Sequence, residues 1–593
     1  MVGYFIADKT LANRSRVEKA IRNLETIGEC RSFETDSLLV YFLFNRQKNN
    51  YFVDEQDLVV VSTGAAVYKN RIRNESLSLI AKNAIENIFN YDDLSGHFNL
   101  AILNLKNNNL TLYTDKEGLQ SAFYYKKDGA YILSSNLLLL ASQVPQTLNK
   151  TAIVDFIHIG NPLSGQTIFS EINRVPPSVS FKNVNGKWEE KREWKISVKF
   201  PYAENSTKTI LNDISQSLES SIEFCKFIPS DEIVADLTGG TDTRTIVSFL
   251  SKLILQLNVF TAGPSSHIDV KIAKIIANKL RLKLTWLPPA AKNESISSFD
   301  EAIEYADGCS NIFQTLPSIN FLKEKAKYFR IVFGGNGGPL FKDHYWLFEF
   351  NRINRLKEPN WARLARLSVL SNFVQNDILK KQFQYDVYSR LEMLFLNVSK
   401  EIVGTNNQKM DYVYFSRKCV DFMAPHFTLS NNFFDVFHPM LYGEIVERAI
   451  NSNPQIRKNC NLQFSMIYKN NSKLAWIKTD NIYPSIPTNG IFFFLKILIL
   501  FRYLKAFLRK FSELVLKKGG TQPIHNDFMD LEFLQKTQLI DYLDTESMRL
   551  KEIINESVLK EYLANIGHGS NLYYVQNILS IELFLNKTNK LIA

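Results

Sequence analysis

Apolar residues alternate with polar ones, or form short runs, through the first third of the chain. Examples are SLLVYFLF, DLVVVS, FNLAILNL, LTLYTD and AYILSSN, which are separated by turns rich in Asn, Gly and Lys. This spacing is typical of β-strands that bury one face or both. The pattern predicts a β-rich layered domain over residues 1–195. The more polar stretch EWKISVKFPYAE, residues 193–204, contains Pro201 and is predicted to be a linker.

The pattern changes after this linker, where helix-like stretches alternate with short apolar strands. TKTILNDISQSLESSIEFC precedes EIVADL, TRTIVSFLSKLI precedes LNVFTAG, and DVKIAKIIANKLR precedes LKLTWL. Such alternation is typical of a parallel sheet with helices on its faces. From Glu301 onward the apolar spacing is mostly helical. Residues 205–593 are therefore predicted to form an α/β domain with a parallel sheet and a helical extension.

Composition narrows the class of protein without selecting one. The 593 residues, 45% of them hydrophobic and 22% charged, describe a globular chain of roughly two to four domains. The net charge of +10 is spread along the sequence, so no nucleic-acid partner is expected. Five scattered cysteines without a C-x-x-C pair argue against disulfides and zinc, and favour a reducing cytoplasm. The N-terminus lacks the basic segment of a signal peptide.

A glycine turn follows the strand EIVADL and precedes a helix that Thr or Asp is expected to cap. Gly239 and Gly240 would let backbone N–H groups approach phosphate oxygens, and the helix N-terminus adds partial positive charge. The hydroxyls of Thr238 and Thr243 can donate to the same oxygens, and Asp242 would hold Mg²⁺ there. By spacing alone, a tight connection without a ligand is the commoner interpretation, and no Walker A loop is present.

Four ordered segments resemble the asparagine synthetase family. LTGGTDTR is similar to its S-G-G-x-D-S pyrophosphate loop, and VFTAG (259–263) to the strand that lies against the adenine. HIDVKIAKIIA places Asp269 and Ala273 at the family's acidic residue and alanine. IVFGGNGGPLFKDHYW (331–346) resembles the segment G-[ED]-G-x-D-E-x-x-x-G-Y without gaps. The resemblance implies an ATP-pyrophosphatase (PP-loop) fold that uses ATP and Mg²⁺.

The same resemblance implies a set of site residues. Asp242 is expected to bind the metal and to act in catalysis with Tyr345 and with Lys478, which lies in the region of a family lysine. The residues expected to bind ATP are Leu237, Thr238, Gly239, Gly240, Thr241, Thr243, Phe260, Gly263, Gly335 and Asn336.

The chain departs from the family pattern in the last of these segments. Asn336 and Leu340 stand where the family has acidic residues, and Pro339 replaces an aspartate associated with metal and catalysis. Proline offers no side-chain acceptor, so this loop cannot bind Mg²⁺ in the usual way. Asp343 or the Asn336 amide is a candidate replacement. His344 and Asp343 are candidate contacts for the acyl-adenylate, and His438 is expected to pack in the core.

The N-terminal half resembles the glutaminase domain of the same family, an α/β/β/α layered fold of the N-terminal-nucleophile (Ntn) hydrolase type. SGHFNLAILN, LTLYTDKEGLQSAFYY, YILSSNLLLLA and QTIFSEINRVPPSV follow its ordered segments. Val2 stands where the family exposes a nucleophilic cysteine, and no other residue replaces that nucleophile. Gly64, Ala65 and Ala66 occupy the glutamine-holding N-G-E. Glutamine hydrolysis is therefore not expected, and this half is interpreted as a retained structural partner or as a surface for another substrate.

The stretch IFFFLKILILFRYLKAFLRKF, residues 491–511, lies outside the family pattern. It is predicted to be part of an apolar and basic helical segment over 491–518. Its five Lys and Arg residues make a bilayer span costly. Two interpretations stay open: a helix that covers the synthetase domain, and an interfacial helix that docks on anionic lipid at the inner face of the membrane.

Together these observations predict an ATP-dependent amide-forming ligase in the cytoplasm. A small-molecule, peptide or sugar carboxylate would be activated as an acyl-adenylate, pyrophosphate would leave, and ammonia or an amine would complete the amide. One alternative is asparagine synthesis from aspartate, and another is a nucleotide-binding scaffold whose catalytic site has decayed. The formation of a homodimer is left open.

Overall fold

The structure is a computed structural model that describes most of the chain. The described residues are 3–45, 51–199, 206–289, 297–343, 346, 358–368, 377–384, 387–480, 483–488, 504, 508, 538–544, 547–564 and 571–592. Val2, His344, Tyr345 and the predicted helical segment 491–518, apart from Leu504 and Leu508, lie outside them. Among the described residues, no helix is both long enough and apolar enough to cross a membrane.

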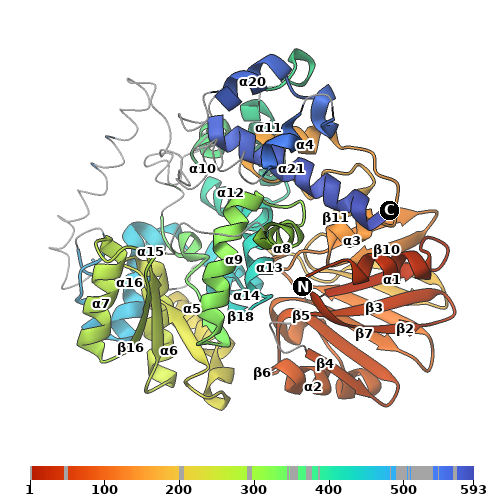
Figure 1. Cartoon of the computed structure of the whole chain (residues 1–593). Helices are drawn as coiled ribbons and strands as arrows, with labels where there is room; N and C mark the ends of the chain where they lie inside the picture. The colour runs from red at the N-terminus through yellow and green to blue at the C-terminus, as the bar shows by residue number, and fades with distance from the viewer. Residues whose placement is uncertain are drawn as a thin grey trace.

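Two antiparallel sheets lie face to face in the N-terminal half, at the right of Figure 1. The first has the strand order β11-β9-β10-β1-β3-β2, with bounds Ile172–Arg174, Phe123–Lys127, Ala130–Ser134, Gly3–Asp8, Leu38–Asn45 and Ile27–Glu34. The second has the order β13-β12-β8-β7-β5-β4, with bounds Lys187–Arg192, Val179–Val184, Asn109–Thr114, Leu94–Asn104, Leu58–Tyr68 and Tyr51–Glu55. A short strand, β6 (Arg71–Ile72), pairs with β5.

The alternation of side chains explains why these strands are apolar on both faces. Tyr4 and Ile6 of β1 pack between the two sheets, whereas the intervening Phe5 packs with the helices outside the first sheet. Those helices are α1 (Arg14–Arg22), α3 (Leu137–Ala141) and α4 (Lys150–Ile159). Helix α2 (Arg73–Ile85) covers the outer face of the second sheet through Leu77 and Ile80. The predicted α/β/β/α layering is confirmed.

The predicted parallel sheet is also confirmed, with the strand order β16-β15-β14-β17-β18 and every pair parallel. Its bounds are Lys283–Leu287, Asn258–Ala262, Ile233–Asp236, Ile331–Phe333 and Asp435–Phe437. One face packs against α5 (Thr207–Ser221), α6 (Thr241–Leu253) and α7 (Ile268–Leu280). The other packs against α8 (Ser297–Ala306) and α9 (Ile312–Ala326).

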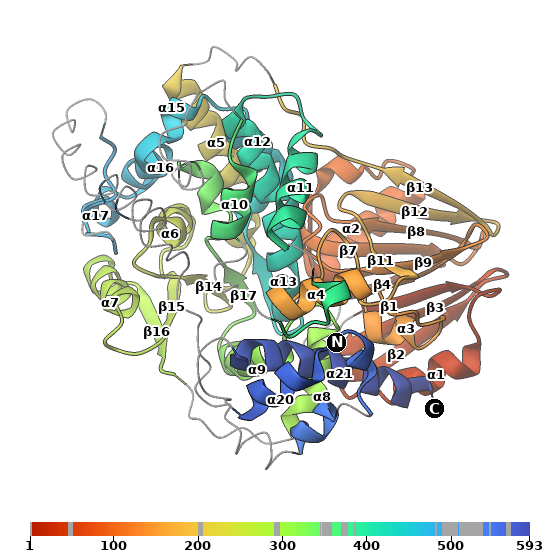
Figure 2. The same ribbon diagram turned by 90° about the horizontal axis from the view of Figure 1, so that it is seen from above.

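Helices make up most of the described remainder. The last one, α21 (Asn571–Ile592), runs beside α8 and α9 and also reaches α1, α3 and α4 of the N-terminal half, as Figure 2 shows. The Asn577 amide donates to the Ile157 carbonyl oxygen at 3.0 Å. The division at residues 195 and 205 stays a prediction. The helices are α10 (Trp361–Ser368), α11 (Val387–Ser399), α12 (Asn406–Val413), α13 (Ala424–Ser430), α14 (Gly443–Ile450), α15 (Pro454–Arg457), α16 (Asn461–Asn470), α17 (Ser472–Ala475), α20 (Glu556–Ala564) and α21 (Asn571–Ile592).

Candidate functional site

The parallel sheet has a switch point beside its central strand. From β14 the chain moves through β15 to β16 at one edge, and then returns to β17 on the other side of β14. The loops after β14 and β17 therefore leave neighbouring strand ends in opposite directions, which opens a crevice where α/β sheets commonly bind ligands. A cavity of about 610 Å³ lies there.

Most of the sequence-predicted site residues meet at this cavity. Gly239 and Thr241 are not among the lining residues, although they belong to the same turn, and Lys478 does not line it either. The predicted residues that line the cavity are Leu237, Thr238, Gly240, Asp242, Thr243, Phe260, Gly263, Gly335 and Asn336.

The glycine turn is held by its own hydroxyls. The Thr238 N–H donates to Thr243 Oγ1 at 3.2 Å, and the two hydroxyl oxygens are 3.1 Å apart. Gly240, not the expected Thr or Asp, is the N-cap of α6, and no side chain caps this helix. That expectation was wrong because the helix begins at Thr241, which places Thr241 and Asp242 inside its first turn and not at the cap position. The uncapped end leaves helix N–H groups available to an anion.

The loop after β17 is in close contact with this turn. A Cβ added at Gly335 would lie 2.5 Å from the Thr243 nitrogen, and one at Gly338 would lie 2.1 Å from Asp242 Cγ. Both contacts are shorter than real Cβ contacts, so only glycine permits this approach. The glycines of GGNGG are therefore explained by loop packing as well as by any ligand.

Asp242 is fully engaged by donors that sequence reasoning missed. Lys342 Nζ lies 2.6 and 2.8 Å from its two carboxylate oxygens, and Gln463 Nε2 donates to Oδ1 at 2.9 Å. The Asp242 side chain is 29% exposed and that of Lys342 is 13% exposed. The predicted metal ligand is therefore an ion-pair partner in this structure.

The residues around Asp242 do not fit a protein-bound Mg²⁺. The candidate replacement Asp343 is buried and accepts from the Asn459 N–H at 2.9 Å, away from the cavity lining. The Asn336 amide nitrogen lies 3.3 Å from His438 Nε2. No group of three metal-ligating side chains occurs within the described ranges. Mg²⁺ on a nucleotide is usually held by one or two protein carboxylates together with phosphates, and the carboxylate expected here, Asp242, already binds Lys342 and Gln463.

Buried Lys325, from α9, occupies the other end of the cavity and was also missed. Its Nζ lies 2.5 Å from Asp236 Oδ1 and 4.4 Å from the centre of the Phe260 ring. Phe321 meets Phe260 edge-on, with ring centres 5.7 Å apart. This end therefore offers an apolar wall with one neutralised carboxylate.

Lys478 lies near the glycine turn through its backbone. The buried Arg244 guanidinium donates to the carbonyl oxygens of Ile477 and Lys478, both at 2.6 Å, and burial lowers the pKa of Arg244 to about 10. The Asp480 N–H donates to the Gly239 carbonyl at 3.1 Å. The Lys478 side chain itself is exposed. Its catalytic role stays a prediction, as does that of Tyr345.

No protein-family model matches the chain, and no curated protein matches its sequence. Solved structures show partial similarity, and three of them are enzymes of related kinds. One is glutamine phosphoribosylpyrophosphate amidotransferase from B. subtilis complexed with ADP and GMP, with 8% identity over 50% of this chain and 67% of that chain, and a TM-score of 0.23. Another is the allosteric regulatory enzyme of purine biosynthesis, with 9% identity over 40% of this chain and 60% of that chain, and a TM-score of 0.21. The third is glutamine-dependent NAD⁺ synthetase from Acinetobacter baumannii in complex with ADP, with 12% identity over 46% of this chain and 60% of that chain, and a TM-score of 0.17.

The chain spans 67% of the length of the first of these enzymes and 60% of the other two. TM-scores at this level carry no argument about activity.

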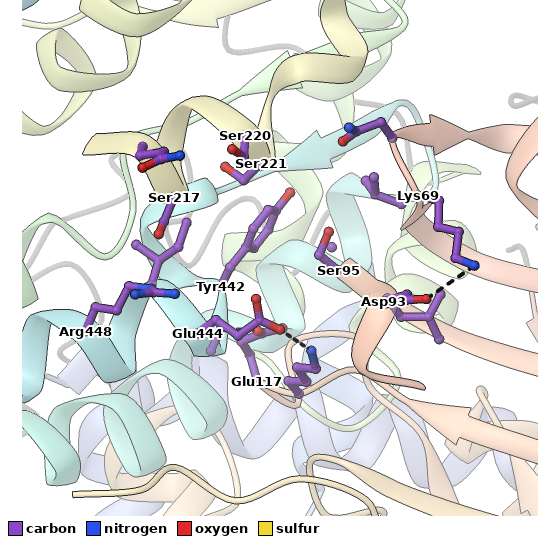
Figure 3. A pocket seen from close by; sticks show the side chains of 18 of the residues that line it. Lys69, Asp93, Ser95, Glu117, Ser217, Ser220, Ser221, Tyr442, Glu444 and Arg448 are labelled. Atoms are coloured by element: carbon purple, nitrogen blue, oxygen red, sulfur yellow. Dashed lines mark hydrogen bonds and ion pairs between the residues drawn. The ribbon is translucent and has the colours of Figure 1, made fainter. Parts of the chain in front are cut away.

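A second cavity, of about 510 Å³, lies between the second antiparallel sheet and helices α5 and α14. Figure 3 shows Ser217, Ser220 and Ser221 on one side and Lys69 and Asp93 on the other. Its lining carries both charge signs, as does the lining of the cavity beside β14.

Buried polar groups form the inner wall of this second cavity. Glu117 Oε1 accepts from the Gly443 N–H at 2.5 Å, while Glu117 Oε2 and the Tyr442 hydroxyl have no hydrogen-bond partner in the described part of the chain. Burial raises the pKa of Glu117 to about 8 and lowers that of His97 to about 4.

His438 stacks on Phe427, with ring centres 4.3 Å apart, and is buried, in line with its expected packing role.

Replacing Glu117 with glutamine is expected to change the pH dependence of stability. Because the folded protein holds this proton more tightly than the unfolded chain, wild-type stability falls as pH rises from about 4 towards about 8. Glu117→Gln removes that loss, so its stability relative to wild type should rise by about 2 kcal/mol between mildly acidic and mildly basic pH.

Urea unfolding of wild type and Glu117→Gln at mildly acidic and at mildly basic pH measures this difference in stability. Glu444→Gln is the matched control, since Glu444 pairs with Lys116 beside the same cavity but its side chain is 58% exposed. Parallel pH profiles for wild type and Glu117→Gln would contradict the expectation.

Proposed function

We propose that the cavity beside β14 binds ATP, and that the chain is an ATP-dependent amide-forming ligase similar to the asparagine synthetase family. The observation that carries the proposal is the meeting of two glycine loops at neighbouring strand ends, next to a helix N-terminus without a side-chain cap. Such a place supplies backbone N–H donors to phosphate oxygens. The order of the four family-like segments along the chain supports the same assignment.

The reaction has two steps in this proposal. A substrate carboxylate oxygen attacks the α-phosphorus of ATP, the bond to the bridging oxygen of the β-phosphate breaks, and pyrophosphate leaves. The nitrogen of ammonia or an amine then attacks the acyl carbon and loses a proton to solvent, and AMP leaves with the electron pair of the acyl–oxygen bond. The amine comes from solution or from another protein, because residue 2 is valine and provides no glutaminase nucleophile.

The chain contributes binding and orientation. The N–H groups at the start of α6 and the hydroxyls of Thr238 and Thr243 hold the departing pyrophosphate in place, and Phe260 and Phe321 form an apolar wall at the other end of the cavity. Catalysis of this type depends mainly on positioning and on preorganised donors. No step is assigned to a metal on Asp242.

A nucleotide-binding protein without transfer chemistry is the second candidate. It is favoured by one observation, the pairing of Asp242 with Lys342 in a loop where Pro339 supplies no acceptor. Binding of ATP without pyrophosphate release would support this candidate. Nothing in the cavity selects aspartate, so asparagine synthesis remains one case of the general ligase.

Thr243→Val tests the site directly. Loss of the hydroxyl removes a donor to a charged phosphate, which should weaken ATP binding by about tenfold or more. Thr245→Val is the matched control, because the Thr245 hydroxyl bonds to the Thr241 carbonyl at 3.0 Å and Thr245 does not line the cavity.

The measurements are ATP binding by calorimetry and pyrophosphate release with panels of carboxylates and amines. Equal ATP affinity for wild type and Thr243→Val would count against this site. Absence of pyrophosphate release with every pair would leave only the second candidate.

A further inference from the structure

The carboxylates of the cavity beside β14 all have partners from the chain itself. Asp236 pairs with Lys325 at 2.5 Å, Asp242 with Lys342 at 2.6 Å, and Asp269 accepts from the Gly239 N–H at 2.8 Å. All three aspartates line the cavity. A cation carried in on a phosphate group would therefore meet carboxylates that are already neutralised or hydrogen-bonded.

We propose that Lys342 takes the place of a divalent cation beside Asp242, so that this site binds nucleotide phosphates without requiring Mg²⁺. The proposal rests on the proposed function, because it concerns the same cavity. It adds what that function leaves open: the ligand is the free polyphosphate anion, and its affinity does not depend on a metal bridge to the protein.

The geometry around Asp242 favours a permanent ion pair. Lys342 reaches both carboxylate oxygens, and Gln463 donates to one of them from α16. Gly338 lies so close to the carboxylate that even a methyl group would overlap it. On that side the carboxylate has no room for a hydrated Mg²⁺, and on the other side its oxygens already bind the ammonium and the Gln463 amide. Displacing the ammonium would leave both charges without their partner in a site that is only partly open to solvent.

The electrostatic consequence differs from that of a metal site. An unpaired Asp242 would repel the phosphates, and a bridging Mg²⁺ would then be needed to bind them. With Lys342 beside it the pair is neutral, and the N–H groups at the start of α6 act on the anion without that repulsion. Mg²⁺ in solution lowers the concentration of free ATP anion, so it should leave binding unchanged or weaken it.

The test is calorimetric titration of the full chain with ATP, and separately with inorganic pyrophosphate, in excess EDTA and in excess MgCl₂. The expected result is that Mg²⁺ tightens neither ligand by as much as threefold. Tightening of threefold or more overturns the inference and leaves the proposed function standing. If neither ligand binds under either condition, the proposed function fails and the inference fails with it.

Two variants show whether Lys342 is the cause. Lys342→Gln leaves Asp242 without its cation, so binding in EDTA should fall by about tenfold or more and be restored by Mg²⁺. The double variant Asp242→Asn/Lys342→Gln removes both charges and should lose this Mg²⁺ dependence while keeping a similar side-chain volume. If Mg²⁺ has the same effect on Lys342→Gln as on wild type, Lys342 is not the substitute. Circular dichroism of both variants checks that they are folded.

Discussion

Replacing Arg457 with methionine is expected to lower the free energy of unfolding by about 3–5 kcal/mol. Arg457 is fully buried and donates through Nη1 to Asp411 Oδ2 at 2.7 Å and to the Leu340 carbonyl at 2.8 Å. Its guanidinium lies 4.5 Å from the Trp346 ring centre, and Trp346 Nε1 donates to Asp411 at 3.1 Å. Burial already raises the pKa of Asp411 to about 6 although Arg457 lowers it. Methionine would leave this carboxylate unpaired.

The expected loss comes from the uncompensated carboxylate, and a second variant tests that explanation. Arg457→Met/Asp411→Leu removes both charges and should recover much of the stability. Arg448→Met is the surface control: Arg448 Nη1 lies 2.7 Å from both oxygens of Asp213, but the two side chains are 45% and 51% exposed. Its loss should stay below about 1 kcal/mol. Urea unfolding measures all three variants. A loss of that small size for Arg457→Met itself would contradict the expectation.

The Arg457 contacts also reach the candidate site. Leu340 lies two residues before Lys342, so the guanidinium fixes the carbonyl of the turn that carries the ammonium to Asp242. The structure thus links a buried ion pair to the position of the cavity loop. Part of any loss of nucleotide binding in Arg457→Met should come from movement of this loop.

The layered fold was predictable because its cause is local. Strands such as β3 and β5 are buried along their whole length, and this burial selects the apolar runs that the sequence displays. The parallel sheet was predictable for the same reason, since strands covered by helices on both faces are short and apolar. The α/β/β/α order of the layers was expected only through the resemblance. The contact of α21 with the N-terminal half was not expected, because nothing local in α21 indicates its partner.

The candidate site also contains residues that the sequence indicated and residues that only the fold brings together. The glycines and threonines of the turn stood out because LTGGTDTR resembles a known pyrophosphate loop and three later segments follow it in the expected order. Lys342, Gln463 and Lys325 did not, because an isolated lysine or glutamine is usually a solvated surface residue. Their partners are far away in the sequence: Lys342 and Asp242 are 100 positions apart, and Gln463 and Asp242 are 221 apart. Only the fold brings them together, so the role of Asp242 as an ion-pair partner could not be predicted.

Replacing Gly335 with alanine is expected to lower the stability by about 1–3 kcal/mol and to weaken nucleotide binding by at least about tenfold. The new Cβ would lie 2.5 Å from the Thr243 nitrogen and 2.6 Å from the Asp242 carbonyl carbon. Both are backbone atoms, which cannot rotate away, so one of the two loops must move. Because the same loops line the cavity, their separation should spread the donors that face the phosphates.

Gly240→Ala is the matched control for stability. Its Cβ would meet only the Thr238 hydroxyl at 3.5 Å, an ordinary contact, and its backbone is extended with φ −73°. Thermal unfolding should therefore shift for Gly335→Ala and change little for Gly240→Ala, while titration with ATP follows binding in both. If Gly335→Ala unfolds and binds ATP as wild type does, the two loops are not packed as closely as their contacts indicate, and a nucleotide site between them loses its main support.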